Sequence, residues 1–154
     1  MPAALAFHGA VATPQGDVLV AAGATVDSAT MTVSGTSHAF LYHASQGIWE
    51  VLPSLTLNIW TREGLKCIPT FYSTDKIIYA ISGGYASFRF GGPSTPSTAI
   101  LSIDETFAGW TTPGSLSSPR EGVSLAIFDG GLRLLVVGPV GAADLTADVH
   151  VAAH

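Results

Sequence analysis

The sequence predicts an all-β fold, and three observations carry this prediction. Apolar residues come in short bursts separated by glycine, proline, serine and aspartate, which is typical of strands joined by turns. Seventeen glycines and nine prolines are scattered over 154 residues, which favours many short elements over long helices. The bursts also recur along the chain, so the fold is expected to be an array of similar units.

The composition excludes two classes of protein and suggests that a partner covers part of the surface. Of the residues, 47% are hydrophobic and only 11% are charged, against about 25% charged in an ordinary soluble domain. This balance excludes an intrinsically disordered chain. A formal net charge of −5 offers no basic surface for a phosphate backbone, so nucleic-acid binding is not expected. Because few charges are available to coat the surface, we expect an apolar face that a partner covers.

The sequence contains no pattern typical of a cofactor site or a targeting signal. Cys67 is the single cysteine, and no Cys/His spacing fits a structural zinc, so neither a disulfide, a metal nor a cofactor is expected. The N-terminal residues lack a basic region, and no run reaches the ~18 apolar residues of a membrane span. We therefore expect a cytoplasmic chain without membrane contact, folded as one domain over residues 1–154.

Each repeating unit begins with a strand of small residues. His8, Arg62 and Arg120 stand at the same place in three units, with steps of 54 and 58 residues by subtraction. A second apolar strand follows and ends in glycine, a third strand alternates, and a fourth carries a tryptophan, Trp49 or Trp110. Four short strands in each unit predict propeller blades. We expect two complete blades and one with three strands, about eleven strands in all, at about 8–53, 62–113 and 120–154.

The order of certain residues along each unit resembles the order found in the kelch repeat. A glycine doublet, an aspartate, a tryptophan and an Arg-x-Gly follow one another in Gly83-Gly84, Ile103-Asp104, Trp110 and Pro119-Arg120-Glu121-Gly122. The resemblance covers nearly the whole chain. It departs at Gly23 and Gly138, which lack the preceding glycine, and at His8, where later units have arginine. The resemblance implies that the strand starting at Arg-x-Gly is innermost in each blade and that the tryptophan strand is outermost.

Three blades make half a propeller, and both end faces of the stack would be left bare. At ~25 cal/mol per Å², exposing a few hundred Å² of apolar surface on each face costs on the order of 10 kcal/mol. Since this matches the whole stability of a domain, we expect a homodimer that closes a six-bladed ring, the number common among kelch propellers. The alternative is a fragment of a longer chain that holds the remaining blades.

The predicted ligand site lies at the mouth of the propeller, where first strands start and second strands lead into third strands. Seven side chains are expected there: His8, Trp60, Arg62, Tyr85, Phe88, Arg89 and Arg120. Guanidinium groups hold carboxylates through paired hydrogen bonds, and aromatic rings supply contact area. The expected ligand is therefore an acidic peptide or protein, or a small carboxylated molecule. The resemblance implies that Arg62 and Arg120 point into the mouth, whereas the plainer interpretation is that they tie turns by bonding backbone carbonyls.

No catalytic residue is assigned from the sequence. There is no Ser-His-Asp order, no glycine-rich phosphate loop and no pair of carboxylates at a cleft-forming spacing. His38 and His43 lie five residues apart and are expected to face opposite ways, which argues against a metal pair. The first hypothesis is a non-catalytic binding module. The alternatives are a sugar-active enzyme, such as an epimerase or hydrolase of acidic sugars, and a purely structural half-ring.

Overall fold

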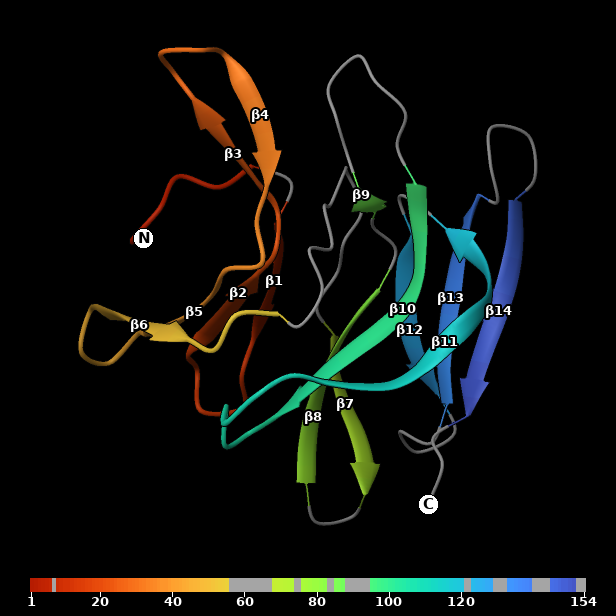
Figure 1. Ribbon diagram of the computed structural model, residues 1–154. Helices are drawn as coiled ribbons and strands as arrows, with labels where there is room; N and C mark the ends of the chain where they lie inside the picture. Colours follow the sequence, from red (N-terminus) through yellow and green to blue (C-terminus); the bar gives the residue numbers. More distant parts are fainter. Residues whose placement is uncertain are drawn as a thin grey trace.

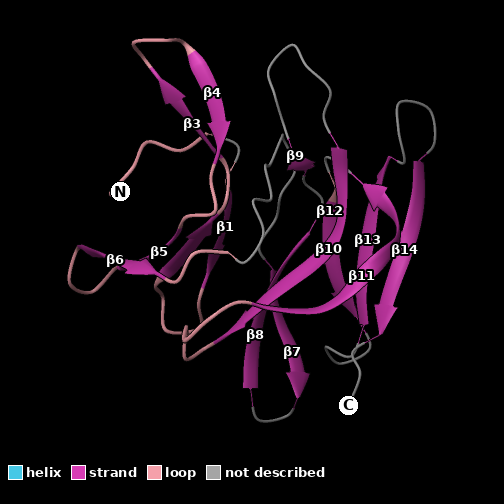
Figure 2. Cartoon of the chain, in the orientation of Figure 1, coloured by secondary structure: helices cyan, strands magenta, loops and turns pink. Residues whose placement is uncertain are grey.

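The computed structural model describes residues 1–6, 8–55, 68–73, 76–82, 85–87, 95–120, 123–128, 133–139 and 145–151 (Figure 1). Every regular element in these ranges is a strand, and neighbouring strands pair antiparallel (Figure 2). The all-β prediction is therefore confirmed. No helix in the described part of the chain is long and apolar enough to cross a membrane.

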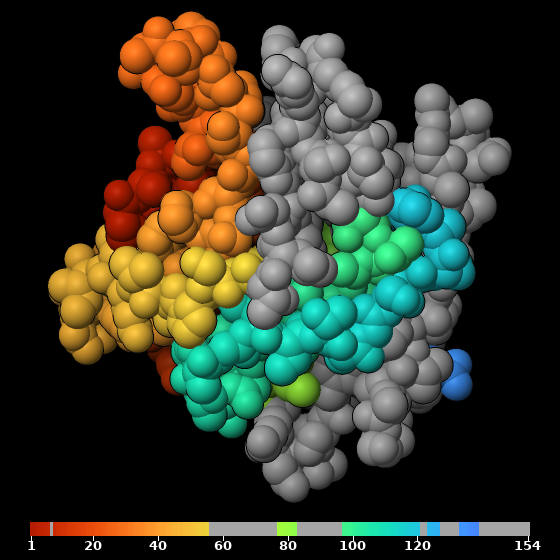
Figure 3. Space-filling model, in the orientation of Figure 1, coloured from red at the N-terminus to blue at the C-terminus, as the bar shows by residue number. Residues whose placement is uncertain are grey.

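The first part of the chain forms a four-stranded sheet, which we call sheet 1. Its strands follow the chain in the order β1 (Gly9–Ala12), β2 (Val18–Ala21), β5 (Ala39–His43) and β6 (Ile48–Leu52). Tight turns join β1 to β2 and β5 to β6, and each turn contains a glycine at positive φ, Gly16 at 88° and Gly47 at 68°. Between β2 and β5 the chain forms a separate hairpin, β3 (Ala24–Asp27) and β4 (Thr32–Gly35), which projects beyond the body of the molecule (Figure 3).

Two further sheets follow in sequence. Sheet 2 has the order β11-β10-β8-β7, built from β7 (Ile68–Ser73), β8 (Lys76–Ser82), β10 (Thr95–Asp104) and β11 (Thr111–Arg120). The short strand β9 (Tyr85–Ser87) pairs with the first residues of β10. Sheet 3 contains β12 (Ser124–Phe128), β13 (Arg133–Pro139) and β14 (Leu145–Val151). Arg120 thus ends the fourth strand of sheet 2, whereas the repeat pattern predicted it at the first strand of the third unit.

The three sheets stack so that sheet 2 is buried on both faces. Alternate residues of β8 and β10 point to opposite sides, as the two-residue period of a strand requires. One face packs on sheet 1 through a cluster that includes Leu19, Leu41, Leu52, Tyr79, Ile81, Leu101, Ile103 and Trp110. The other face packs on sheet 3 through Ala80, Ile100, Leu116, Val123, Leu125, Leu134 and Val136. Sheets 1 and 3 each bury one face against sheet 2.

Candidate functional site

The two ends of sheet 1 are built differently. At one end β1 starts, β2 ends and β5 starts, since Gly9 pairs with Ala21 and Ala21 pairs with Ala39. The β3–β4 hairpin rises from this end, which we call the hairpin end (Figure 1). The opposite end, formed by the β1–β2 and β5–β6 turns, we call the turn end. The mouth predicted from the sequence corresponds to the hairpin end.

Two of the seven predicted site residues, His8 and Arg120, have described side chains, and Tyr85 is described by its backbone alone. His8 is exposed and directly precedes β1 at the hairpin end. Tyr85 begins β9, and its backbone pairs with Pro96 of β10. Trp60, Arg62, Phe88 and Arg89 lie outside the described residues.

Arg120 is 2% exposed and holds two strands together. Its Nη1 donates a hydrogen bond of 2.8 Å to the carbonyl oxygen of Gly138 in β13. A buried guanidinium bound to a backbone carbonyl is the contact expected from the plainer interpretation of the sequence. His8 therefore belongs to the start of sheet 1, whereas Arg120 belongs to the join between sheets 2 and 3.

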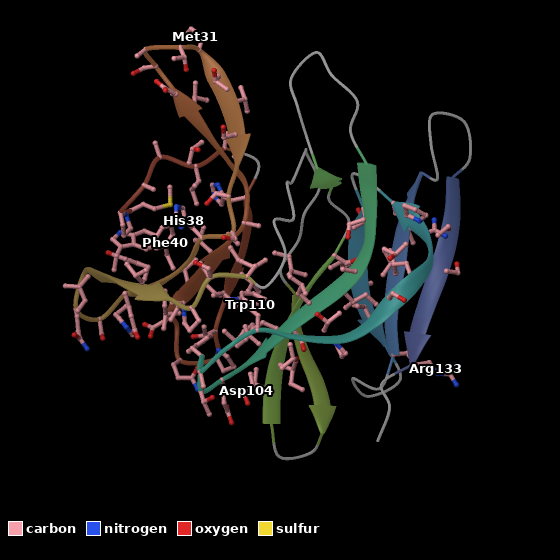
Figure 4. All side chains as sticks on the ribbon, in the orientation of Figure 1. Met31, His38, Phe40, Asp104, Trp110 and Arg133 are labelled. Atoms are coloured by element: carbon pink, nitrogen blue, oxygen red, sulfur yellow. The ribbon has the colours of Figure 1, made fainter. Side chains whose placement is uncertain are left out.

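A cavity of about 460 Å³ lies at the turn end, away from the predicted mouth. Its walls come from the β1–β2 turn, from β5 and β6, and from the turn between β10 and β11: Thr13, Gln15, Asp17, Leu41, His43, Glu50, Glu105, Thr106 and Phe107. Asp104, the last residue of β10, marks this end in Figure 4. Three carboxylates and one histidine make the lining acidic, so an anionic ligand would be repelled here.

His43 is held on both ring nitrogens. Its Nδ1 lies 2.9 Å from Oδ2 of Asp17, and its Nε2 lies 2.9 Å from Oε2 of Glu50. The other oxygen of Asp17 accepts a hydrogen bond of 3.0 Å from the backbone of Ala44. The bonds to Glu50 and then to Asp17 raise the pKa of His43 above its ordinary value, because both favour the imidazolium. We call this arrangement the His43 clasp.

The turn after β10 closes the cavity from the side of sheet 2. Phe107 has a φ of 52°, and its ring stacks on Tyr79 with centroids 5.6 Å apart. Tyr79 is 1% exposed, and its hydroxyl has no hydrogen-bond partner among the described groups. Burial, with a contribution from the Glu105 carboxylate, raises the pKa of Tyr79. Trp110 donates from Nε1 to the carbonyl of Pro53 at 3.0 Å, which ties this turn to the chain leaving sheet 1.

The His43 clasp was not anticipated from the sequence, which considered His43 only as a possible partner of His38. His38 instead packs its ring on Phe40, with centroids 5.8 Å apart (Figure 4). The signal for the clasp was the short turn after His43. It pairs His43 with Ile48, so Glu50 stands diagonally across the strands on the same face. In the part of the chain that the structure describes, no group of three or more His, Cys, Asp or Glu side chains is arranged to hold a metal ion.

Comparisons with known proteins find the fold but no family. No family description and no curated protein matches the sequence. Among solved structures, the chain is similar to the structure of YjhT, with a TM-score of 0.63 and 9% sequence identity. The match covers 97% of this chain and 52% of that chain, so this chain spans about half the length of the structure it matches. At such low identity the similarity shows the fold alone.

Proposed function

We propose that the chain is a non-catalytic binding module of the kelch-like propeller type. Its ligand is an acidic peptide or protein, or a small carboxylated molecule, bound at the hairpin end. The observation that carries the proposal is the stacking of three consecutive antiparallel sheets, the middle one buried on both faces. Propeller blades pack in this way, and the long match to a much larger structure is consistent with it.

The hairpin end is suited to binding a ligand because two connections that contain strands of their own lie there. The β2–β5 connection forms the β3–β4 hairpin, and the β8–β10 connection contributes β9 beside the start of β10. Loops placed at one end of a rigid stack of sheets are where binding residues concentrate. His8 is exposed at the same end.

Charge favours the hairpin end over the turn end for an anionic ligand. The cavity at the turn end is lined by Asp17, Glu50 and Glu105, which would repel a carboxylate. Because Arg120 is engaged with the Gly138 carbonyl, we assign the direct ligand contact to Arg62 and Arg89. Arg120 then has a supporting role, holding the end of β11 on β13.

The His43 clasp favours a binding module over an enzyme. A general acid or base needs a proton-carrying atom within reach of the substrate. Both ring nitrogens of His43 are occupied by carboxylates, so neither is available for that exchange. One observation favours the second candidate, a sugar-active enzyme: a cavity of about 460 Å³ lined by carboxylates has the size of a small-ligand site.

Titration calorimetry separates these functions. The ligands are a glutamate-rich peptide, a lysine-rich peptide of equal length as control, and an acidic sugar. We expect the glutamate-rich peptide alone to bind, and Arg62→Ala and Arg89→Ala to abolish binding at an unchanged melting temperature. Arg120→Ala is expected to lower the melting temperature. Turnover of the acidic sugar would support the enzyme instead, and binding of the lysine-rich peptide alone would contradict the proposal.

A further inference from the structure

Sheet 1 presents a second face that no other described sheet covers. The residues of sheet 1 that face sheet 2 include Leu19, Ala21, Ala39, Leu41 and Leu52. The residues between them in the strands point the other way. They form what we call the outer face of sheet 1, and none of them is charged: Ala10, Ala12, Val18, Val20, Phe40, Tyr42, Trp49 and Val51.

This outer face is an apolar and aromatic platform. The ring of Trp49 lies 4.9 Å from that of Tyr42 and meets that of Phe40 edge-on at 6.5 Å. Val51, at 67% exposure, is one of the most exposed large apolar side chains of the described chain, and it pairs with Phe40. Val20 and Phe40 at the centre of this face are 4% and 3% exposed, so its exposed part is formed by Ala10, Ala12 and Val51 around them. Exposed apolar residues that share one face of a sheet mark an interaction site.

Sheet 3 also has a face that points away from sheet 2. In β13, Leu134 and Val136 are buried against sheet 2, so Arg133, Leu135 and Val137 point outward. Val137 is 40% exposed. Ser124 and Ala126 of β12 are exposed on this same outer face of sheet 3, since they pair with Val137 and Leu135.

We infer that a second copy of this chain covers both outer faces, with sheet 1 of each copy packed on sheet 3 of the other. A twofold axis makes the two contacts identical and closes a ring of six sheets. The contact continues the stacking already present inside the chain, where sheet 1 meets sheet 2 and sheet 2 meets sheet 3. The inference rests on the proposed propeller architecture and names the partner and the surfaces that complete it.

A second copy is inferred from the length of the structure that this chain matches and from the chemistry of the two outer faces. Nearly all of this chain matches about half of a longer chain of the same fold, so two copies supply the amount of structure found there. The uncharged outer face of sheet 1 needs an apolar counterpart, and the outward Leu135 and Val137 of sheet 3 provide one. A remaining part of a longer polypeptide is the competing occupant, and the mass of the chain in solution separates the two.

Light scattering of the chain tests the inference. We expect a mass of twice 15.8 kDa. Val51→Lys and Val137→Asp are each expected to reduce the mass to that of one chain, because each places a charge in both apolar contacts. Val26→Lys is the matched control, since Val26 is 54% exposed on the β3–β4 hairpin, and it is expected to leave the dimer intact. Circular dichroism confirms that each variant is folded.

Mixing the two disrupted variants identifies the pairing of faces. In a Val51→Lys and Val137→Asp pair, one contact holds both introduced charges and the other contact is unaltered. We therefore expect the equimolar mixture to recover the mass of two chains. A dimer that survives Val137→Asp but not Val51→Lys would show sheet 1 paired with itself and overturn the inference. A wild-type chain that stays monodisperse at 15.8 kDa would also overturn it.

The oligomeric state and peptide binding are measured separately, so the failure of one proposal does not count against the other. An intact dimer that binds no glutamate-rich peptide counts against the ligand alone. A monomer that binds the peptide with wild-type affinity counts against the ring alone.

Discussion

The turn end and the hairpin end of sheet 1 both connect antiparallel strands, but they do so with different kinds of connection. At the turn end the connections are short, glycines at positive φ close them, and the His43 clasp joins β5 and β6 to the turn before β2. At the hairpin end the β2–β5 connection extends into a ribbon with exposed side chains such as Val26 and Met31. The comparison indicates that the turn end maintains the geometry of the sheet, while the hairpin end, where we propose that the ligand binds, tolerates a longer connection.

The largest loss of stability is expected from the removal of a tryptophan that packs between sheets 1 and 2. Trp110→Ala removes a side chain that is 6% exposed where β11 begins and deletes its bond to Pro53, which directly follows β6. We expect the free energy of unfolding to fall by about 3–5 kcal/mol, as for other buried large-to-small changes. Urea denaturation measures the change, with Val26→Ala on the hairpin as the control. A loss as small as that of the control would contradict the assigned packing.

A matched pair of glycines compares the backbone of the two ends directly. Gly23 at the hairpin end has a φ of 104°, and a Cβ there would lie 2.7 Å from the carbonyl oxygen of Ala6. Gly16 at the turn end has a φ of 88° with open space around it. We expect Gly23→Ala to cost about 2–3 kcal/mol and Gly16→Ala about 1 kcal/mol, since both are strained and only the first meets a neighbour. Equal losses in denaturation experiments would refute this ordering.

The His43 clasp predicts a dependence of stability on pH at the turn end. The pKa of His43 is raised in the folded chain, so its stabilising contribution is complete below the unfolded value of about 6.5. That contribution is lost as the pH rises through the folded pKa. We expect the melting temperature of the wild type to exceed that of His43→Gln at acidic pH, and the gap to narrow above neutrality. Parallel melting curves across the pH range would show that the clasp is not titrating.

The smallest effect is expected at the tip of the hairpin. Met31 is 76% exposed, so Met31→Ala removes little buried surface. We expect the free energy of unfolding to change by less than about 0.5 kcal/mol, as for other surface substitutions. A larger loss in urea denaturation would mean that the hairpin packs on another surface, such as that of a second copy.

The sequence predicted the strands of sheet 1 well because their apolar residues are packed on a core. Apolar bursts such as Val18–Ala21 and Ala39–Tyr42 are visible without any knowledge of tertiary contacts. The β3–β4 hairpin was not predicted as strands, because its strands have four residues each and most of their side chains contact solvent. One local signal was available, since the Asp27 carboxylate accepts hydrogen bonds from the backbone of Ala29 and Thr30 and shapes the turn.

The candidate sites were harder to predict than the strands, since they depend on contacts between distant residues. Arg120 resembles a ligand-binding arginine in sequence, yet its partner is the carbonyl of Gly138, 18 residues away. The His43 clasp needs Asp17, which is 26 residues from His43. The ligand, the mouth and the dimer stay predictions.

The way in which the base of the β3–β4 hairpin is anchored affects how the sequence of such a chain can change during evolution. Ala24 pairs with Gly35, and the backbone of Thr36 donates to the carbonyl of Gly23 at 3.0 Å, so the ribbon leaves and rejoins the molecule at one point. A segment anchored in this way can be lengthened, shortened or replaced without shifting the strands beneath it. It is therefore a natural position for grafting a foreign peptide, and a place where related chains could diverge in specificity while keeping one scaffold.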